Sequence, residues 1–189
     1  MPLSYLITSM TPSPFAEKIW EMKKHFNRFE NQDKTQENSV ITLNEAHITL
    51  KRRFYLKDPS LEDEVVKSLD NIKFDPIKIS VISTDIFPSE TMHNVLIGRV
   101  SEPAQITALH QNILETIFPF TTPESLAETH SFNPHISLIY DLADADIEAA
   151  KEYANEHIFP MDFELSNFLL LRSIEGVSKE RVILRTIQA

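Results

Sequence analysis

The chain has 189 residues, of which 42% are apolar and 24% charged, as is typical of a globular protein with a sizeable core. Its 28 acidic and 18 basic residues give a net charge of −10, which disfavours broad coating of long nucleic acids but allows a small anion in a locally positive site. The absence of cysteine excludes disulfides, thiolate zinc sites and cysteine nucleophiles, and the presence of only two glycines excludes the glycine-rich loops that bind ATP or NAD.

Helical and strand patterns alternate along the whole chain. The first half predicts, in order, a strand (3–8), a helix (15–29), two strands (40–43 and 46–56), a helix (58–72) and a strand (77–87). The second half predicts a strand (95–100), a helix (103–118), a strand (132–140), a helix (144–157) and a final pair of strands (163–171 and 181–187). No basic stretch opens the chain and no apolar run approaches the length that crosses a membrane, so we expect a cytoplasmic monomer without membrane attachment.

The order of these elements repeats at an offset of 88 residues, which is the separation of His47 and His135. At this offset, the strand 95–100 matches both the first strand, 3–8, and the last, 181–187. Side-chain identity between the two copies is low, so the repeat rests on order and spacing. We therefore predict one domain, residues 1–189, made of two related lobes.

Two short motifs occupy equivalent positions in the two copies. They read His47-Ile48-Thr49-Leu50 and His135-Ile136-Ser137-Leu138. Because alternate side chains of a strand share a face, the histidine and the hydroxyl residue of each motif point away from its two buried apolar residues. Lobes related by a pseudo-twofold axis would place these strands face to face and bring both histidines to one surface.

Such a pair of histidines suits displacement at a phosphodiester, which needs a base to deprotonate the attacking water and an acid to protonate the leaving oxygen. Histidine serves both roles because its ordinary pKa of about 6.5 lets both forms coexist near neutrality. Thr49 and Ser137 can donate hydrogen bonds to the non-bridging oxygens. The scheme requires no cofactor and no metal, and the residues leave open whether His47 or His135 is the base.

The paired motifs, the segment Phe132-Asn133-Pro134 and the late strand Phe168-Leu169-Leu170-Leu171-Arg172-Ser173 resemble the two-histidine (2H) phosphoesterases, a superfamily that includes RNA 2',3'-cyclic phosphodiesterases first named 2'-5' RNA ligases. The resemblance implies an α+β fold of two pseudo-symmetric lobes, each a mainly antiparallel sheet backed by helices, with the active site in a groove between them. It also implies metal-independent hydrolysis of 2',3'-cyclic phosphates on nucleotides or RNA ends, a step of RNA processing, with His47 and His135 as catalytic residues.

Two other functions stay open at this point. One is cleavage or ligation of 2',5'-linked oligonucleotides, and the other is a nucleotide-binding module without turnover. In each, the expected partner is a nucleotide or a short RNA end.

The alternation of side chains along a strand offers further candidates for substrate contacts. Lys51 and Arg53 lie two and four residues beyond Thr49, so regular alternation would place them on the same face of the strand as His47 and Thr49. They either contact substrate phosphate or protect an exposed strand edge from pairing with another chain. Tyr55 is expected on this same face of the strand and is the better candidate for stacking on a base. Arg172 either faces the groove or forms a solvent ion pair. No role is assigned to the helical histidines, which are His25, His110 and His157.

Overall fold

The computed structural model describes residues 3–26, 40–42, 46–87, 94–101, 103–126, 132–174 and 180–189. The strands are β1 (Leu3–Met10), β2 (Val40–Thr42), β3 (His47–Phe54), β4 (Ile77–Phe87), β5 (Asn94–Val100), β6 (His135–Leu142), β7 (Met161–Leu165), β8 (Asn167–Ile174) and β9 (Glu180–Gln188). The helices are α1 (Ser13–His25), α2 (Glu62–Leu69), α3 (Ala104–Ile117), α4 (Pro123–Leu126) and α5 (Ile147–His157), with single 3₁₀ turns before α2 (Pro59–Leu61) and α5 (Asp144–Asp146).

The described strands form one antiparallel sheet in the order β2-β9-β8-β1-β3-β6-β5-β4-β7. The expected α+β fold with antiparallel pairing is therefore confirmed. The two lobes do not carry separate sheets facing each other, as we expected of the motif strands. Instead, β3 and β6 lie edge to edge and pair at Ile48 and Ile136, which joins the two halves into one sheet.

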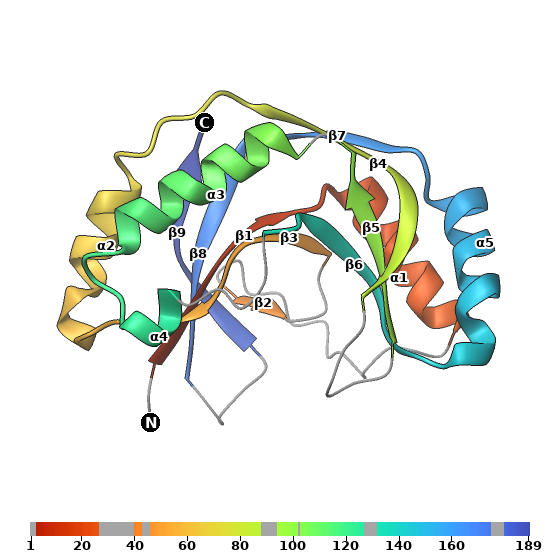
Figure 1. Cartoon of the computed structure of the whole chain (residues 1–189), viewed down its shortest axis with the longest axis horizontal. Coiled ribbons are helices and arrows are strands. Elements are labelled where there is room, and N and C mark those ends of the chain that lie inside the picture. The colour runs from red at the N-terminus through yellow and green to blue at the C-terminus, as the bar shows by residue number, and fades with distance from the viewer. Residues whose placement is uncertain are drawn as a thin grey trace.

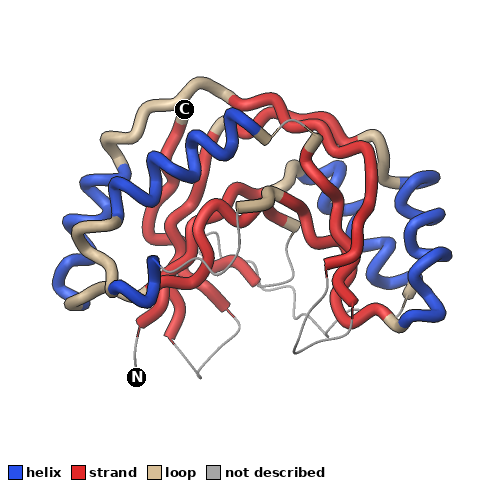
Figure 2. Tube along the Cα trace, viewed as in Figure 1, coloured by secondary structure: helices blue, strands red, loops and turns tan. Residues whose placement is uncertain are grey.

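The sheet bends into an arch, with helices on its outer side (Figures 1 and 2). The strand order is symmetric about the junction of β3 with β6, so that β1 and β5 occupy equivalent places, as do β8 and β4. Under the predicted repeat, this order would match β5 with the first strand and not with the last. We call the side of the sheet opposite the helices the inner face.

The helices that follow β1 and β5 cross to the other half of the sheet. Helix α1 follows β1 but contacts β6 and α5, whereas α3 follows β5 but contacts β3 and α2 (Figure 1). Each lobe is therefore completed by a helix from the other half of the chain.

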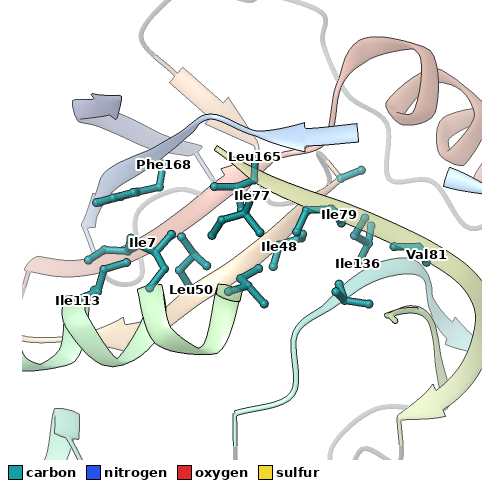
Figure 3. Close-up of a cluster of buried hydrophobic side chains, with 14 of the residues drawn as sticks. Ile7, Ile48, Leu50, Ile77, Ile79, Val81, Ile113, Ile136, Leu165 and Phe168 are labelled. Atoms are coloured by element: carbon teal, nitrogen blue, oxygen red, sulfur yellow. The ribbon is translucent and has the colours of Figure 1, made fainter. Parts of the chain in front are cut away.

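The main core lies between the sheet and these helices. Figure 3 shows buried side chains from β1, β3, β4, β6, β7 and β8 gathered along the sheet, with Ile113 of α3 beside Ile7. Ile48, Leu50, Ile136 and Leu138 all belong to this core and are at most 1% exposed. Since alternate strand residues point to opposite faces, the remaining residues of both motifs lie on the inner face.

The predicted strand 163–171 is in fact two strands, and this part of the prediction was wrong. Strand β7 pairs with β4 at one edge of the sheet, whereas β8, after Ser166, pairs with β1 and β9 in the other half. The apolar pattern hides the break because Leu165 and Phe168, on either side of it, are both buried. A short helix, α4, also lies between the predicted helix 103–118 and the predicted strand 132–140, where no element was predicted.

Candidate active site

The two motifs meet at the junction of β3 and β6. The pair Ile48–Ile136 is antiparallel, so His47 and Thr49, which flank Ile48, lie close to His135 and Ser137, which flank Ile136. Side chains directly opposite in such a pair have Cβ atoms about 5 Å apart, and diagonal neighbours are roughly 7–8 Å apart. All four are half-buried on the inner face.

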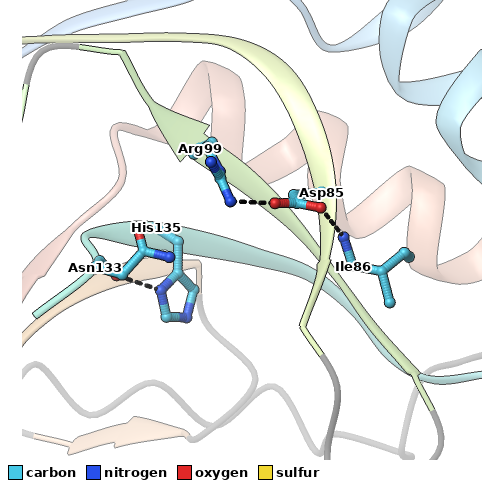
Figure 4. A network of polar contacts seen from close by, with 5 residues as sticks. All are labelled: Asp85, Ile86, Arg99, Asn133 and His135. Atoms are coloured by element: carbon cyan, nitrogen blue, oxygen red, sulfur yellow. Dashed lines mark hydrogen bonds and ion pairs between the residues drawn. The ribbon is translucent and has the colours of Figure 1, made fainter. Parts of the chain in front are cut away.

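The imidazole of His135 is held by two contacts. Its Nδ1 lies 2.8 Å from the carbonyl oxygen of Asn133 (Figure 4), and its ring stacks on Phe87 of β4 with centroids 5.1 Å apart. Because a carbonyl oxygen only accepts, Nδ1 carries the hydrogen. The neutral ring therefore has its lone pair on Nε2, the atom available for taking a proton.

The charge around His135 favours this neutral form. Burial lowers the pKa of His135 below its ordinary value of 6.5, and the positive charge of Arg52 lowers it further, against the opposing effect of the Asn133 hydrogen bond. Arg52 thus lies near His135 on the inner face, three residues beyond Thr49. Regular alternation along the strand did not predict that Arg52 would lie on this face.

A β-bulge in β3 explains why Arg52 takes this place. The register with β1 shifts on either side of the pair Ile7–Lys51, so parity does not continue past Thr49. Lys51 is 3% exposed and pairs with Ile7, a residue of the main core, so it lies on the outer, helix-covered face. Placing Lys51 beside His47 and Thr49 was therefore wrong.

An ion pair adjoins His135 on the side of β5. Arg99 pairs with His135 across the strands, and its guanidinium donates to the carboxylate of Asp85 from β4 (Figure 4). Asp85 also accepts the peptide N–H of Ile86 at 2.8 Å, which fixes its carboxylate. A charged pair, half exposed, thus borders the site on this side.

The opposite side of the site is apolar. Met10 pairs with His47 and packs against a small cluster on the inner face made of Leu6, Leu169 and Leu171. Thr8, which pairs with Thr49, is 1% exposed and donates its hydroxyl to the carbonyl of Ile48 at 2.8 Å. The paired motifs thus lie between an apolar surface on β1 and β8 and a polar one on β4 and β5.

The other predicted substrate contacts, Arg53 and Tyr55, lie near and beyond the end of β3. Arg53 is exposed and lies near Arg181 of β9, whose pKa is lowered by burial and then by the charge of Arg53. Tyr55 follows the end of β3, where its N–H donates to the hydroxyl of Ser125 in α4 at 2.8 Å. It is six residues from Thr49, roughly 20 Å along an extended chain, and so is not brought to the paired motifs.

Arg172 lies on the outer face. Its guanidinium donates to both carboxylate oxygens of Glu62 in α2, at 2.9 and 3.1 Å, and Tyr5 donates its hydroxyl to the same carboxylate at 2.9 Å. Facing the groove was thus the wrong alternative for Arg172, and the ion pair is the right one. Leu171, its neighbour in β8, takes the inner face instead.

The described residues contain no group of three or more histidine, aspartate or glutamate side chains arranged to hold a metal ion. Among the same residues, no helix is both long and apolar enough to cross a membrane.

Comparisons with known proteins agree with this architecture. The model of the 2'-5' RNA ligase superfamily matches residues 12–176. Escherichia coli LigT complexed with 3'-AMP is 14% identical over 99% of this chain and 97% of its own, with a TM-score of 0.62. TT0787 of Thermus thermophilus is 14% identical over 98% and 97%, with a TM-score of 0.63. Kluyveromyces marxianus Usb1 with uridine monophosphate is 9% identical over 100% and 99%, with a TM-score of 0.51. No curated protein matches the chain.

Proposed function

Because the chain belongs to the 2'-5' RNA ligase superfamily, we propose that it hydrolyses 2',3'-cyclic phosphates of nucleotides or short RNA ends to 2'-phosphates. The observation that carries this proposal is the pairing at Ile48–Ile136, which brings the two histidines and two hydroxyl residues that flank this pair together on the inner face. The 3'-AMP and uridine monophosphate held by two of the similar structures support a nucleotide as substrate.

In this mechanism His135 is the general base. Its Nδ1–H is held by Asn133, so Nε2 accepts the proton of the attacking water as the water oxygen bonds to phosphorus. The bond from phosphorus to O3' breaks, and His47, as the general acid, gives its proton to that oxygen. The products are a 2'-phosphate and a free 3'-hydroxyl.

The remaining groups hold the phosphate. The hydroxyls of Thr49 and Ser137 donate to the non-bridging oxygens and keep the phosphorus in line with the water and the leaving oxygen. Arg52 adds a positive charge beside His135, where negative charge accumulates in the transition state. We propose that a monomer in the cytoplasm performs this reaction.

The test is hydrolysis of 2',3'-cyclic AMP by the wild type, His47→Ala and His135→Ala, with the product isomer identified. We expect 2'-AMP from the wild type, a loss of at least roughly 100-fold in each variant and no effect of EDTA. Inhibition by EDTA would contradict the metal-free mechanism.

Two outcomes would favour the other functions. Faster cleavage of 2',5'-linked than of cyclic substrates in a panel that includes 3',5'-linked controls would indicate an oligonucleotide phosphodiesterase. Tight nucleotide binding without any product would indicate a binding module.

A further inference from the structure

His110 lies on the outer side of the sheet, away from the proposed reaction. It belongs to α3, is 5% exposed and is buried between that helix and β3. A buried imidazole must satisfy its polar atoms, so its partners indicate what it holds in place.

The first partner is the backbone of the first motif. Nδ1 of His110 lies 2.6 Å from the carbonyl oxygen of Leu50, so Nδ1 carries a hydrogen and donates it. Leu50 stands between Thr49 and Lys51, at the bulge where the register of β3 with β1 shifts. The hydrogen bond therefore fixes the segment of β3 that directs Arg52 toward the inner face.

The second partner belongs to the segment that opens the second motif. The ring of His110 stacks on Phe132, with centroids 3.9 Å apart and planes 3° apart. Phe132 immediately precedes Asn133, whose carbonyl accepts the hydrogen bond from Nδ1 of His135. One side chain thus contacts Leu50, two residues before Arg52, and Phe132, next to Asn133; Arg52 and Asn133 are two of the residues that act on His135.

We propose that His110 is a positioning residue for the paired-histidine site: its Nδ1–H holds the β3 bulge through Leu50, and its ring holds Phe132 so that Asn133 stays on His135. This inference rests on the proposed function for its effect on turnover. Its effect on the environment of His135 does not depend on turnover and is measured separately.

Two substitutions separate the two contacts. His110→Phe keeps an aromatic ring against Phe132 but removes the donor to Leu50. His110→Asn keeps a short amide donor in the place of Nδ1 but removes the ring. Ile113→Val, on the same helix and 0% exposed, is the matched control for loss of core packing.

The primary measurement is an NMR titration of the His135 imidazole in the full chain. In the wild type we expect its pKa below 6.5, in line with burial and the charge of Arg52. In His110→Phe the released bulge moves Arg52 away, so the pKa of His135 rises from its wild-type value, although burial still holds it low. In Ile113→Val it stays at the wild-type value even if the melting temperature falls.

Turnover of 2',3'-cyclic AMP is the second measurement. We expect kcat/KM per folded molecule to fall roughly tenfold in both His110 variants, because a small misplacement of a catalytic group is costly.

An unchanged His135 titration in both His110 variants would overturn the inference. If the wild type turns over no cyclic or 2',5'-linked substrate, the proposed function fails, but the titration still decides the role of His110. If His110→Phe does not fold, His110→Asn supplies the comparison, with loss of kcat/KM beyond that of Ile113→Val expected.

Discussion

The ring of Phe87 stacks on the imidazole of His135, with centroids 5.1 Å apart and planes inclined by 26°. The two residues come from strands that are not neighbours in the sheet, since β5 lies between β4 and β6. Phe87 contacts the face of the imidazole while Asn133 binds its edge, so the ring is restrained in both directions. This restraint sets where Nε2 points.

Replacing Phe87 by leucine should therefore slow the reaction more than it weakens the fold. In Phe87→Leu we expect kcat/KM for 2',3'-cyclic AMP to fall several-fold, within about tenfold, because the imidazole samples unproductive orientations. Phe118→Leu, at an exposed phenylalanine beyond α3, is the matched control. Equal activity of the two variants would contradict this role of Phe87.

Removing the charge of Arg52 should move the pH dependence of the reaction. Since Arg52 lowers the pKa of His135, Arg52→Gln should raise that pKa. On the acidic side of the pH profile, the fall in kcat/KM follows protonation of the general base in the free enzyme. This fall, the acidic limb, should then occur at higher pH. Arg185→Gln, at an arginine paired with Asp70, is the control and should leave the limb in place. A limb unchanged by Arg52→Gln would argue against His135 as the base.

Lys23 should make the stability of the protein depend on pH. Its side chain is 4% exposed and near the ring of Tyr140, and burial lowers its pKa from 10.5 to about 8. The folded pKa is depressed, so the favourable contribution is present above pH 10.5 and is lost as the pH falls through 8.

Urea unfolding of the wild type and Lys23→Met at pH 10 and pH 7 tests this. The free energy of unfolding of the wild type, relative to the variant, should fall by roughly 2–3 kcal/mol between these pH values. Lys24→Met, at the exposed neighbour paired with Glu21, should show no such change. A pH-independent difference for Lys23→Met would show that Lys23 titrates normally.

Arg172 should matter for stability and not for catalysis. In Arg172→Gln, Glu62 loses its ion pair and keeps the hydrogen bond from Tyr5, so we expect the free energy of unfolding to fall by roughly 1–2 kcal/mol. The kcat/KM for cyclic substrate should be unchanged. A variant with wild-type stability and reduced activity would instead place Arg172 in contact with substrate.

Gly98 should not tolerate a side chain. It pairs with Ile136 in the sheet, and a Cβ built on it would lie 2.8 Å from Cγ1 of Val81. Valine is β-branched and cannot swing away, so Gly98→Ala should lower the free energy of unfolding by about 1–3 kcal/mol. Ile82→Ala, at a side chain 60% exposed on the adjacent strand, should change it by much less.

The sequence predicted the site as far as strand regularity holds. From His47 to Leu50, and from His135 to Leu138, alternation assigned each side chain to the correct face, because both segments are regular strands there. It failed one residue later, at Lys51, because a bulge is set by pairing with β1 and leaves no periodic signal in β3 itself.

The groups around His135 were missed for a related reason. Phe87, Arg99 and Arg52 reach it across strands that are distant in sequence, and their register depends on the whole sheet. No local pattern marks such contacts. The division between β7 and β8 escaped prediction because Leu165 and Phe168, on either side of it, are both buried and only the strands' pairing partners differ.

The exchange of α1 and α3 between the halves bears on how the chain folds. If either half were produced alone, its sheet would lack the helix that covers it and its own crossing helix would have nothing to pack on. We therefore expect neither half to fold alone, since strands are exchanged as well: β8 pairs with β1 of the first half, and β4 pairs with β5 and β7 of the second. The chain should accordingly fold and unfold in one cooperative transition, with the two histidine motifs brought together only when both halves have assembled.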